Sequence, residues 1–243
     1  MHIYIATPAL GGSVHIPYAI SLMETNELLK SKNIKVTNKV VKSSSLLVAE
    51  RNRLVEAFWQ SDATHMLCVD SDLGWPPQAV LEMLKQDKEF IVGVYPSRTG
   101  KSNDFVFRAQ ENSNGSVKTD KHLIKADYVP AGFMLIARSA FVKMRETFPE
   151  LYFEPKKKYD IGAPISGYCF FDTEIYDGEF WGEDYVFCRR ARKSGVDIWI
   201  DPLIGFDHAG NIGMLQNVLT NKPPPNKINQ FNNVIDMELK EAA

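Results

Sequence analysis

Two aspartates one residue apart, Asp70 and Asp72, follow an apolar run in the stretch HMLCVDSDLGWPP. Because side chains alternate between the two faces of a strand, residues i and i+2 at a strand end project toward the same space. Two negative charges held together are costly unless a positive charge lies between them. The spacing therefore predicts a site for a divalent cation at the end of this strand.

Two further groups of residues have types suited to acid–base or ligand chemistry. Glu183 and Asp184 open a predicted helix after the dipeptide WG, and a carboxylate in that position can take a proton from a hydroxyl group. His208 comes after two short apolar runs, and imidazole is a common ligand of transition metals such as Mn²⁺. Each feature also has a structural interpretation: aspartates before a helix can cap it, an acidic first turn complements the helix dipole, and a single histidine can serve packing.

The sequence matches two ligand-binding motifs only in part. GVYPSRTGKS ends like a phosphate-binding P-loop, yet Tyr95 stands where the loop needs its first glycine. DSDLG begins like a calcium-binding EF-hand loop, yet Gly74 and Leu81 stand at its fifth and twelfth positions, which must supply ligands. The sequence therefore argues against a P-loop nucleotide hydrolase and against a calcium site of this kind.

Short apolar runs and helical-period stretches alternate through the first 95 residues. The predicted strands are 2–7, 34–41, 64–69 and 89–95, and the predicted helices are 16–32, 46–61 and 77–87, the last two with Ser43–Ser45 and Pro76–Pro77 at their starts. Such alternation is typical of βαβ units and a largely parallel sheet. Ligands of open parallel sheets collect beyond the carboxyl ends of the strands, so residues 7–12, 43–45, 70–72 and 95–98 are expected to face one crevice.

The pattern changes after residue 100. Predicted strands at 103–110, 122–130 and 132–137 precede a helix from Arg138, a loop-rich stretch at 154–180 and a helix that opens near residue 183. We therefore predict an α/β fold with one domain over residues 1–210, made of a nucleotide-binding half (1–100) and an α+β acceptor half (101–210) on the same sheet. A C-terminal extension (211–243) follows, with the Pro-rich spacer NKPPPNK and a short helix at 231–240.

Composition narrows the class of protein. The chain of 243 residues has a formal net charge of −2, so its overall charge does not favour binding to nucleic acid. Three cysteines without a CxxC pair favour a reducing compartment, and no apolar run reaches the roughly 18 residues that span a bilayer. We expect a cytoplasmic protein with no membrane span.

Four stretches taken together resemble the GT-A glycosyltransferases, a family that transfers a sugar from a nucleotide diphosphate sugar to an acceptor hydroxyl. They are VDSD (69–72), AGFMLIARSAF (131–141), FWGEDYVFCRRARKSG (180–195) and FDHAG (206–210), and the resemblance covers roughly residues 2–210. It implies a GT-A (Rossmann-like) fold with a mostly parallel central sheet. It also implies Mn²⁺ or Mg²⁺ as the cofactor, a nucleotide diphosphate sugar as the donor, and a glycan or another hydroxyl compound as the acceptor.

The resemblance assigns roles on the donor side. VDSD is similar to the family's DxD motif, in which Asp72 ligates the metal, Asp70 holds the metal's waters or the ribose, and Ser71 lies between them in the donor site. His208 resembles a further metal ligand, so the implied metal set is Asp70, Asp72 and His208. The strand end at Thr7, Pro8 and Ala9 is similar to the nucleotide-base pocket, and Arg51 with Asn52 resembles an Arg-Asn pair that reaches the nucleotide.

On the acceptor side the WGED stretch resembles that of inverting members. Asp184 would then be the general base, Glu183 would contact the acceptor, and Trp75, Trp181 and Tyr185 offer flat walls for sugar rings. Arg98 is placed to neutralise phosphate. Many members bind uracil with an Asp after the second strand; no Asp follows that strand here, so the nucleotide of the donor stays open. The QxxRW sequence of processive synthases is not present, which favours transfer of a single sugar.

Other functions remain open on the sequence. A sugar-phosphate nucleotidyltransferase uses a related sheet and a metal, but usually has a cation in the Gly-rich loop after its first strand; here that loop, ALGGS, has the glycines alone. A non-catalytic nucleotide- or carbohydrate-binding module is a third possibility. Retention of configuration, the acceptor, the linkage and the oligomeric state are not determined by these residues.

Overall fold

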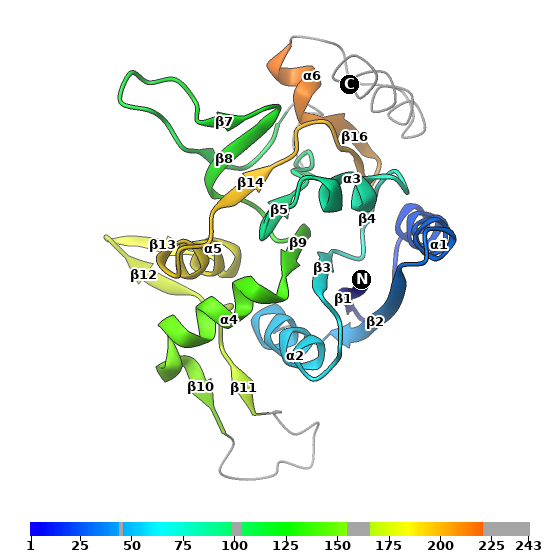
Figure 1. Cartoon of the computed structure of the whole chain (residues 1–243), viewed down its shortest axis with the longest axis horizontal. Coiled ribbons are helices and arrows are strands. Elements are labelled where there is room, and N and C mark those ends of the chain that lie inside the picture. The colour runs from blue at the N-terminus through cyan, green and yellow to red at the C-terminus, as the bar shows by residue number, and fades with distance from the viewer. Residues whose placement is uncertain (44–45, 99–103, 155–165, 221–243) are drawn as a thin grey trace.

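The structure is a computed structural model that describes residues 1–43, 46–98, 104–154 and 166–220 (Figure 1). In chain order the elements are β1 (His2–Leu10), α1 (Ile16–Ser31), β2 (Lys35–Ser43), α2 (Leu47–Trp59), β3 (His65–Val69), β4 (Leu73–Gly74), α3 (Ala79–Lys85), β5 (Phe90–Val92), β6 (Arg108–Ala109), β7 (Thr119–Asp120), β8 (Leu123–Tyr128), β9 (Phe133–Ala137), α4 (Arg138–Thr147), the 3₁₀ turn η1 (Pro149–Leu151), β10 (Tyr152–Phe153), β11 (Gly167–Tyr168), β12 (Glu174–Tyr176), β13 (Glu179–Trp181), α5 (Glu183–Lys193), β14 (Ile198–Ile200), β15 (Gly205–His208), β16 (Asn211–Met214) and α6 (Leu215–Leu219).

A single large sheet contains strands from both halves of the sequence. Its order is β2-β1-β3-β9-β5-β14-β8-β6, with β7 paired to β8. Strands β2, β1, β3, β5 and β14 run in one direction, and β9 and β8 run the opposite way. The predicted α/β fold with a mostly parallel sheet is confirmed. The antiparallel strand β9 lies between β3 and β5, so the two halves interleave within one domain.

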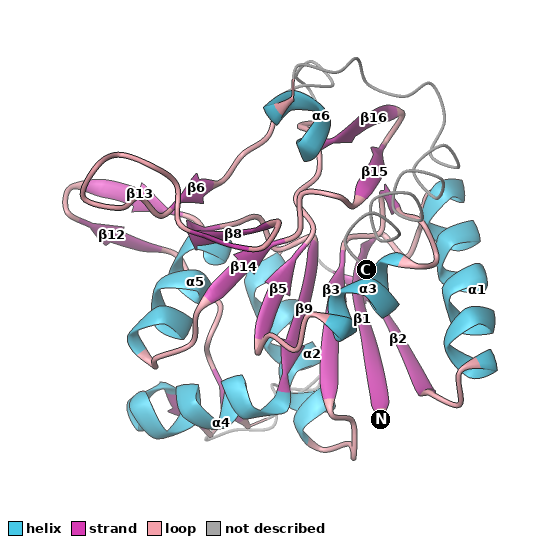
Figure 2. Ribbon diagram, turned by 45° about the horizontal axis from the view of Figure 1, so that its top comes forward, coloured by secondary structure: helices cyan, strands magenta, loops and turns pink. Residues whose placement is uncertain are grey.

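Helices cover both faces of this sheet, because alternate strand residues point to opposite sides. In β3, Met66 and Cys68 pack into the core under α2, α4 and α5, while Leu67 and Val69 pack into a second core under α1 and α3. The resulting three layers can be followed in Figure 2. The strands and helices predicted for residues 2–95 are therefore confirmed in type and order, with β5 shorter than expected.

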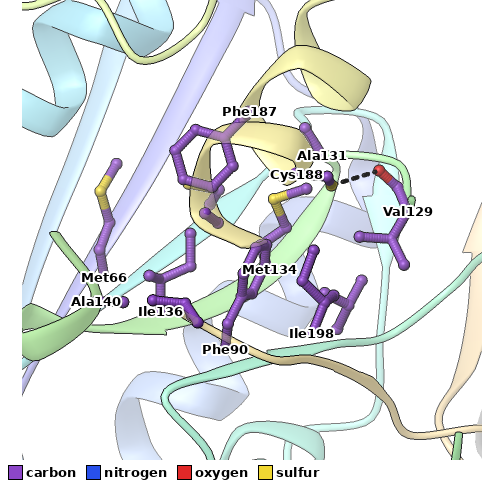
Figure 3. Packing of buried hydrophobic residues seen from close by; sticks show 14 of the residues in the cluster. Met66, Phe90, Val129, Ala131, Met134, Ile136, Ala140, Phe187, Cys188 and Ile198 are labelled. Atoms are coloured by element: carbon purple, nitrogen blue, oxygen red, sulfur yellow. Dashed lines mark hydrogen bonds between the residues drawn. The ribbon is translucent and has the colours of Figure 1, made fainter. Parts of the chain in front are cut away.

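The core that supports α5 is dense with large apolar side chains. Phe187 of α5 lies against Phe90 of β5 with ring centroids 5.8 Å apart, and the Cys188 thiol donates to the Val129 carbonyl oxygen at 3.6 Å (Figure 3). Gly195, with φ +76°, ends the helix in a conformation that favours glycine. The start of α5, where Glu183 and Asp184 lie, is thus held in a fixed position on the sheet.

Several local predictions are wrong in detail. Helix α2 has Leu46 as its N-cap, whereas a serine at 43–45 was expected; residues 44 and 45 lie outside the described residues. The strand expected at 103–110 is reduced to β6. The loop-rich stretch expected at 154–180 contains, in its described part, the short strands β11 and β12 and the start of β13. Beyond residue 210, β16 pairs with β15 and leads into α6, while the expected spacer and final helix (221–243) lie outside the described residues. No helix in the described part combines the length and apolar character needed to cross a membrane.

Candidate functional site

Strand pairing brings His208 to the second aspartate. Asp70 follows β3, and its backbone N–H donates to the Gly132 carbonyl oxygen at 3.0 Å. Asp72 precedes β4, which pairs antiparallel with β15 so that Leu73 lies opposite His208. The Ala209 N–H donates to the Asp72 carbonyl oxygen at 3.2 Å, which secures this register. Residues far apart in sequence are therefore neighbours at the end of β3.

Asp72 lies between two basic groups. Its Oδ2 is 3.5 Å from Nε2 of His208 and 3.0 Å from Nη1 of Arg98. Burial alone raises the pKa of Asp72, but the contacts with His208 and Arg98 outweigh it and the net shift is downward. For His208, burial opposes the charged form, yet the hydrogen bonds with Asp72 and the Pro96 carbonyl raise its pKa overall. The pair thus favours a carboxylate beside an imidazolium when no cation is bound.

The orientation of the His208 ring is set by the backbone. Its Nδ1 lies 2.8 Å from the Pro96 carbonyl oxygen, which can only accept, so Nδ1 carries a proton. In the neutral ring Nε2 then bears the lone pair, directed toward Asp72. Histidines that ligate metals commonly donate their other N–H to a carbonyl in this way. The Nε2 atom of His208 is therefore oriented as in histidines that bind a metal.

The residues around Asp72 could form only part of a metal-binding site. Within the described ranges no three His, Cys, Asp or Glu side chains gather so that they could hold a metal ion. Asp72 and His208 could supply two ligands, and Asp70, expected as a third, pairs with Arg51. Ions such as Mg²⁺ are often bound through one or two protein ligands with substrate phosphates and water completing the shell. The residues fit a cation that is bound together with a diphosphate.

A buried arginine holds the first aspartate. Nη2 of Arg51, on α2, lies 2.9 Å from Oδ1 of Asp70, and Nε lies 3.5 Å from Oε1 of Glu183 at the start of α5. The Arg51 side chain is 4% exposed. Burial opposes its charge, but Asp70 and Glu183 among others raise its pKa, so it stays protonated. Arg51 was expected to reach the nucleotide; here its guanidinium is occupied by two carboxylates.

Asp184 is the acid with the most altered titration in this region. Burial, reinforced by the adjacent Glu183, raises the pKa of Asp184 to about 6. The Tyr185 N–H donates to its Oδ1 at 2.9 Å, which fixes the carboxylate at the first turn of α5. A carboxyl group that titrates near neutral pH can act as a general base.

The capping interpretation of the two aspartates is excluded. Helix α3 begins at Ala79 with Gln78 as N-cap, and no side chain caps it. The acidic residues at the start of α5 do lie in its first turn, where they complement the dipole. Glu183 has an additional role there, because it also pairs with Arg51.

Other expected donor-site residues are more buried than their roles suggest. Thr7, Pro8 and Ala9 are buried at the end of β1, and the Thr7 hydroxyl is 2.7 Å from that of Tyr18. Asn52 donates to the Phe171 carbonyl oxygen at 2.8 Å and accepts from its N–H at 2.9 Å. The main-chain carbonyl of Ser71 accepts from the His15 N–H at 2.9 Å. Thr7, Pro8, Ala9 and Asn52 are therefore packed in the interior, whereas Ser71 is half-buried.

The three aromatic residues expected as walls for sugar rings differ in burial. Trp75 is 1% exposed and its indole N–H donates to Thr25, so its expected contact with sugar is wrong. Trp181 and Tyr185 are half-buried and meet Tyr128: the Tyr128 and Tyr185 rings stack with centroids 5.1 Å apart. An aromatic cluster of Tyr128, Trp181 and Tyr185 thus lies beside Asp184.

Sequence reasoning gave no role to two residues that shape this site. The Gly132 N–H donates to the hydroxyl of the half-buried Tyr95 at 3.1 Å, and the pKa of Tyr95 is raised well above the usual value, chiefly by desolvation of its hydroxyl and then by Asp70. A Cβ on Gly132 would lie 2.3 Å from the Tyr95 hydroxyl oxygen and 2.7 Å from Oδ2 of Asp70. The glycine in AGFMLIA was the available signal, and its contacts are all long-range.

Replacing Gly132 by Ala should therefore damage the site. We expect a loss of about 1–3 kcal/mol in the free energy of unfolding, measured in urea, because Tyr95 and Asp70 must move. We also expect loss of nucleotide binding. The control is Gly178→Ala, at the β12–β13 turn. Its positive φ strains an alanine, but, in contrast to Gly132, no atom lies within 4 Å of the new Cβ. Equal ligand affinity in the two variants would contradict this prediction.

No protein-family model matches this chain, and no curated protein matches it. Solved structures with some similarity include GalNAc-T7 with UDP, GalNAc and Mn²⁺ (10% identity, TM-score 0.41, 85% of this chain and 43% of that chain). They also include the inositol-1-phosphate CTP transferase from T. maritima (10%, 0.40, 82% and 84%) and S. aureus TarS 1–349 in complex with UDP-GlcNAc (11%, 0.40, 83% and 56%). The chain thus spans less than half of the GalNAc-T7 chain and little more than half of TarS 1–349. All three TM-scores are below 0.5, so the chemistry must be inferred from this chain's own residues.

Proposed function

We propose that the protein is a metal-dependent glycosyltransferase that moves a sugar from a nucleotide diphosphate sugar to an acceptor hydroxyl, with inversion. The observation that carries this proposal is the juxtaposition of two groups through Arg51. One is the Asp72–His208 pair with the neighbouring Asp70, and the other is Glu183 with Asp184, whose pKa is near 6. A ligand pair suited to a cation with diphosphate lies on one side, and a base suited to a hydroxyl lies on the other.

The proposed roles follow from these positions. Asp72 and His208 would hold the cation, which when bound would offset the negative charge of the departing diphosphate. Arg98, 62% exposed at its side chain and already beside Asp72, would bind a phosphate oxygen. Asp184 would take the proton of the acceptor hydroxyl, and Trp181 with Tyr185 would exclude water from one side of the acceptor.

The pH dependence of the transfer reaction provides a testable prediction. Because Asp184 must be deprotonated to act as base, kcat/KM should rise about tenfold per pH unit below its pKa of about 6 and level off above it. Since the folded protein binds this proton more tightly than the unfolded chain, the same shift favours folding at acid pH, and its contribution to stability is lost as the pH rises through about 6. A rate independent of pH between 4.5 and 7.5 would remove Asp184 as the base.

A second candidate, sugar-phosphate nucleotidyl transfer, is favoured by a different observation. The loop after β1 turns at Gly11 and Gly12, both with positive φ, and the side chain of Lys42 packs beside Gly12, 3.5 Å from where a Cβ would be. The aliphatic stem of Lys42, on β2, therefore packs against the Gly-rich loop, whose own sequence has no cation. Such a pair can receive a nucleoside triphosphate.

One experiment tests both functions. Thermal unfolding is measured with UDP-, GDP-, CMP- and dTDP-sugars and with CTP or UTP, each with and without Mn²⁺. A ligand at 100 times its Kd should stabilise the fold by about 2.7 kcal/mol. Stabilisation that a nucleotide sugar gives only when Mn²⁺ is present supports glycosyl transfer. Release of pyrophosphate from a triphosphate and a sugar phosphate, measured in a separate assay, supports the second candidate. No shift with any nucleotide would overturn both.

A further inference from the structure

We infer that Arg51 is a positioning residue: one buried guanidinium ties the donor-side acid Asp70 to the acceptor-side acid Glu183, so that the two halves of the site are aligned through it. The inference rests on the proposed function for the names of the two sides. The bridge itself is a feature of the ligand-free protein and can be tested without any substrate.

The Arg51 guanidinium contacts its three neighbours through three different nitrogen atoms. Nη2 contacts Asp70 at 2.9 Å, Nη1 donates to the Ala131 carbonyl oxygen at 3.4 Å, and Nε lies 3.5 Å from Glu183. Nε has no hydrogen-bond partner although it is buried. The contact with Glu183 is thus an ion pair at longer range, and a small movement of α5 would close it to a hydrogen bond.

The surroundings of Arg51 restrict its movement. The next residue, Asn52, is bonded to both backbone groups of Phe171, and the Phe171 ring lies 5.7 Å from the Arg51 guanidinium carbon. Phe171 in turn stacks on Phe187 of α5, with centroids 4.3 Å apart. Helices α2 and α5 are therefore joined both by this packing and by the ion pair. Because a guanidinium is planar and rigid, a shift of one acid is transmitted to the other.

Arg51 also sets the charge around the proposed base. The charged side chains that act on Asp184 are Glu183 on α5 and Arg51 on α2. Asp184 in turn raises the pKa values of Tyr185 and Cys188 on α5 and of Tyr95 beyond β5, and Tyr128 of β8 also raises that of Tyr185. Among these, Glu183 raises the pKa of Asp184 and Arg51 lowers it. Removing each in turn should therefore move this pKa in opposite directions, an effect that loss of packing alone does not produce.

The first test is a double-mutant cycle of Arg51→Met and Glu183→Gln in the ligand-free full chain. Urea unfolding is expected to show strong non-additivity. ¹³C NMR titration should show the Asp184 pKa higher in Arg51→Met and lower in Glu183→Gln. The control cycle is Lys35→Met with Asp62→Asn, an exposed pair with an N–O distance of 2.9 Å and side chains 59% and 71% exposed, which should be near additive. Additive free energies, or a pKa that moves the same way in both variants, would overturn the inference.

The second test asks whether the two sides are coupled. With UDP and Mn²⁺ as the probe, Glu183→Gln should weaken nucleotide binding about fivefold, because the freed Arg51 closes on Asp70. In an Arg51→Lys background, which keeps the charge and the fold but cannot reach both acids, Glu183→Gln should leave UDP affinity unchanged. The same weakening in both backgrounds would overturn the inference. If the unaltered protein binds no nucleotide, the proposed function fails, while the first cycle still decides the bridge.

Discussion

Replacing Asp184 by Asn should abolish sugar transfer and leave the donor bound. General-base catalysis contributes about 10²–10⁴-fold to rate, and the amide cannot accept the acceptor's proton. The change keeps the size of the side chain, and an amide oxygen can still accept the 2.9 Å hydrogen bond from the Tyr185 N–H. We therefore expect kcat to fall by at least about 100-fold, with the Kd for the nucleotide sugar within about twofold of the original.

The matched control for this change is Asp177→Asn. Asp177 is exposed at the β12–β13 turn with φ +51°, a conformation that asparagine also tolerates. Its rate should be unchanged. Undiminished turnover in Asp184→Asn would exclude Asp184 as base. Loss of transfer together with loss of donor binding would instead indicate that Asp184 helps to hold the donor.

Replacing Asp72 by Asn should remove the part of nucleotide binding that depends on metal. Asp72 is the carboxylate that His208 and Arg98 both contact, so it supplies the charge that a cation needs at this point. Even residues that only support metal ligands cost about 10–100-fold in metal affinity when changed, and a ligand should cost at least as much. The thermal shift given by UDP with Mn²⁺ should fall to that given by UDP alone.

Asp207→Asn is the appropriate control for the metal experiment. Asp207 precedes His208 in β15, and its Oδ1 accepts from the Gly210 N–H at 2.7 Å, a bond that asparagine can keep. This variant should retain the full response to Mn²⁺, and treatment with EDTA should reduce it to the level of Asp72→Asn. A response to Mn²⁺ that survives in Asp72→Asn would mean that the cation binds elsewhere.

The predicted metal set of Asp70, Asp72 and His208 agrees only in part with the contacts in the structure. The spacing of Asp70 and Asp72 predicts that both face one space, and both do lie at the end of β3. Their partners differ, however: Arg51 pairs with Asp70, whereas His208 and Arg98 contact Asp72. A turn separates the two aspartates, so the strict alternation of a strand no longer sets their directions. The charge that compensates Asp70 comes from a helix that the spacing does not identify.

Burial accounts for the other differences between the predicted site and the observed one. Trp75 and the strand end at Thr7 have the residue types of ligand walls, but both are enclosed by α1: Trp75 through Thr25, and Thr7 through Tyr18. Tyr95 was expected at the end of its strand, facing the crevice, and as the residue that breaks a P-loop; its half-buried position beside Asp70 and Gly132 was not predicted. Lys42 reaches the loop at Gly12 only because β1 and β2 pair in register.

Local sequence patterns were enough to predict the strands and helices of residues 2–95, the helix that begins with Glu183 and Asp184, and the position of Asp70 and Asp72 after a buried strand. These elements follow from hydrophobic periodicity and from residues that end helices, which act over a few neighbouring positions. Three features of the site came instead from long-range contacts: β9 enters antiparallel between β3 and β5, β4 pairs with β15, and Arg51 lies between two acids. Those outcomes depend on which distant surfaces fit and which charges compensate one another when buried, and neither is encoded in the spacing along the chain.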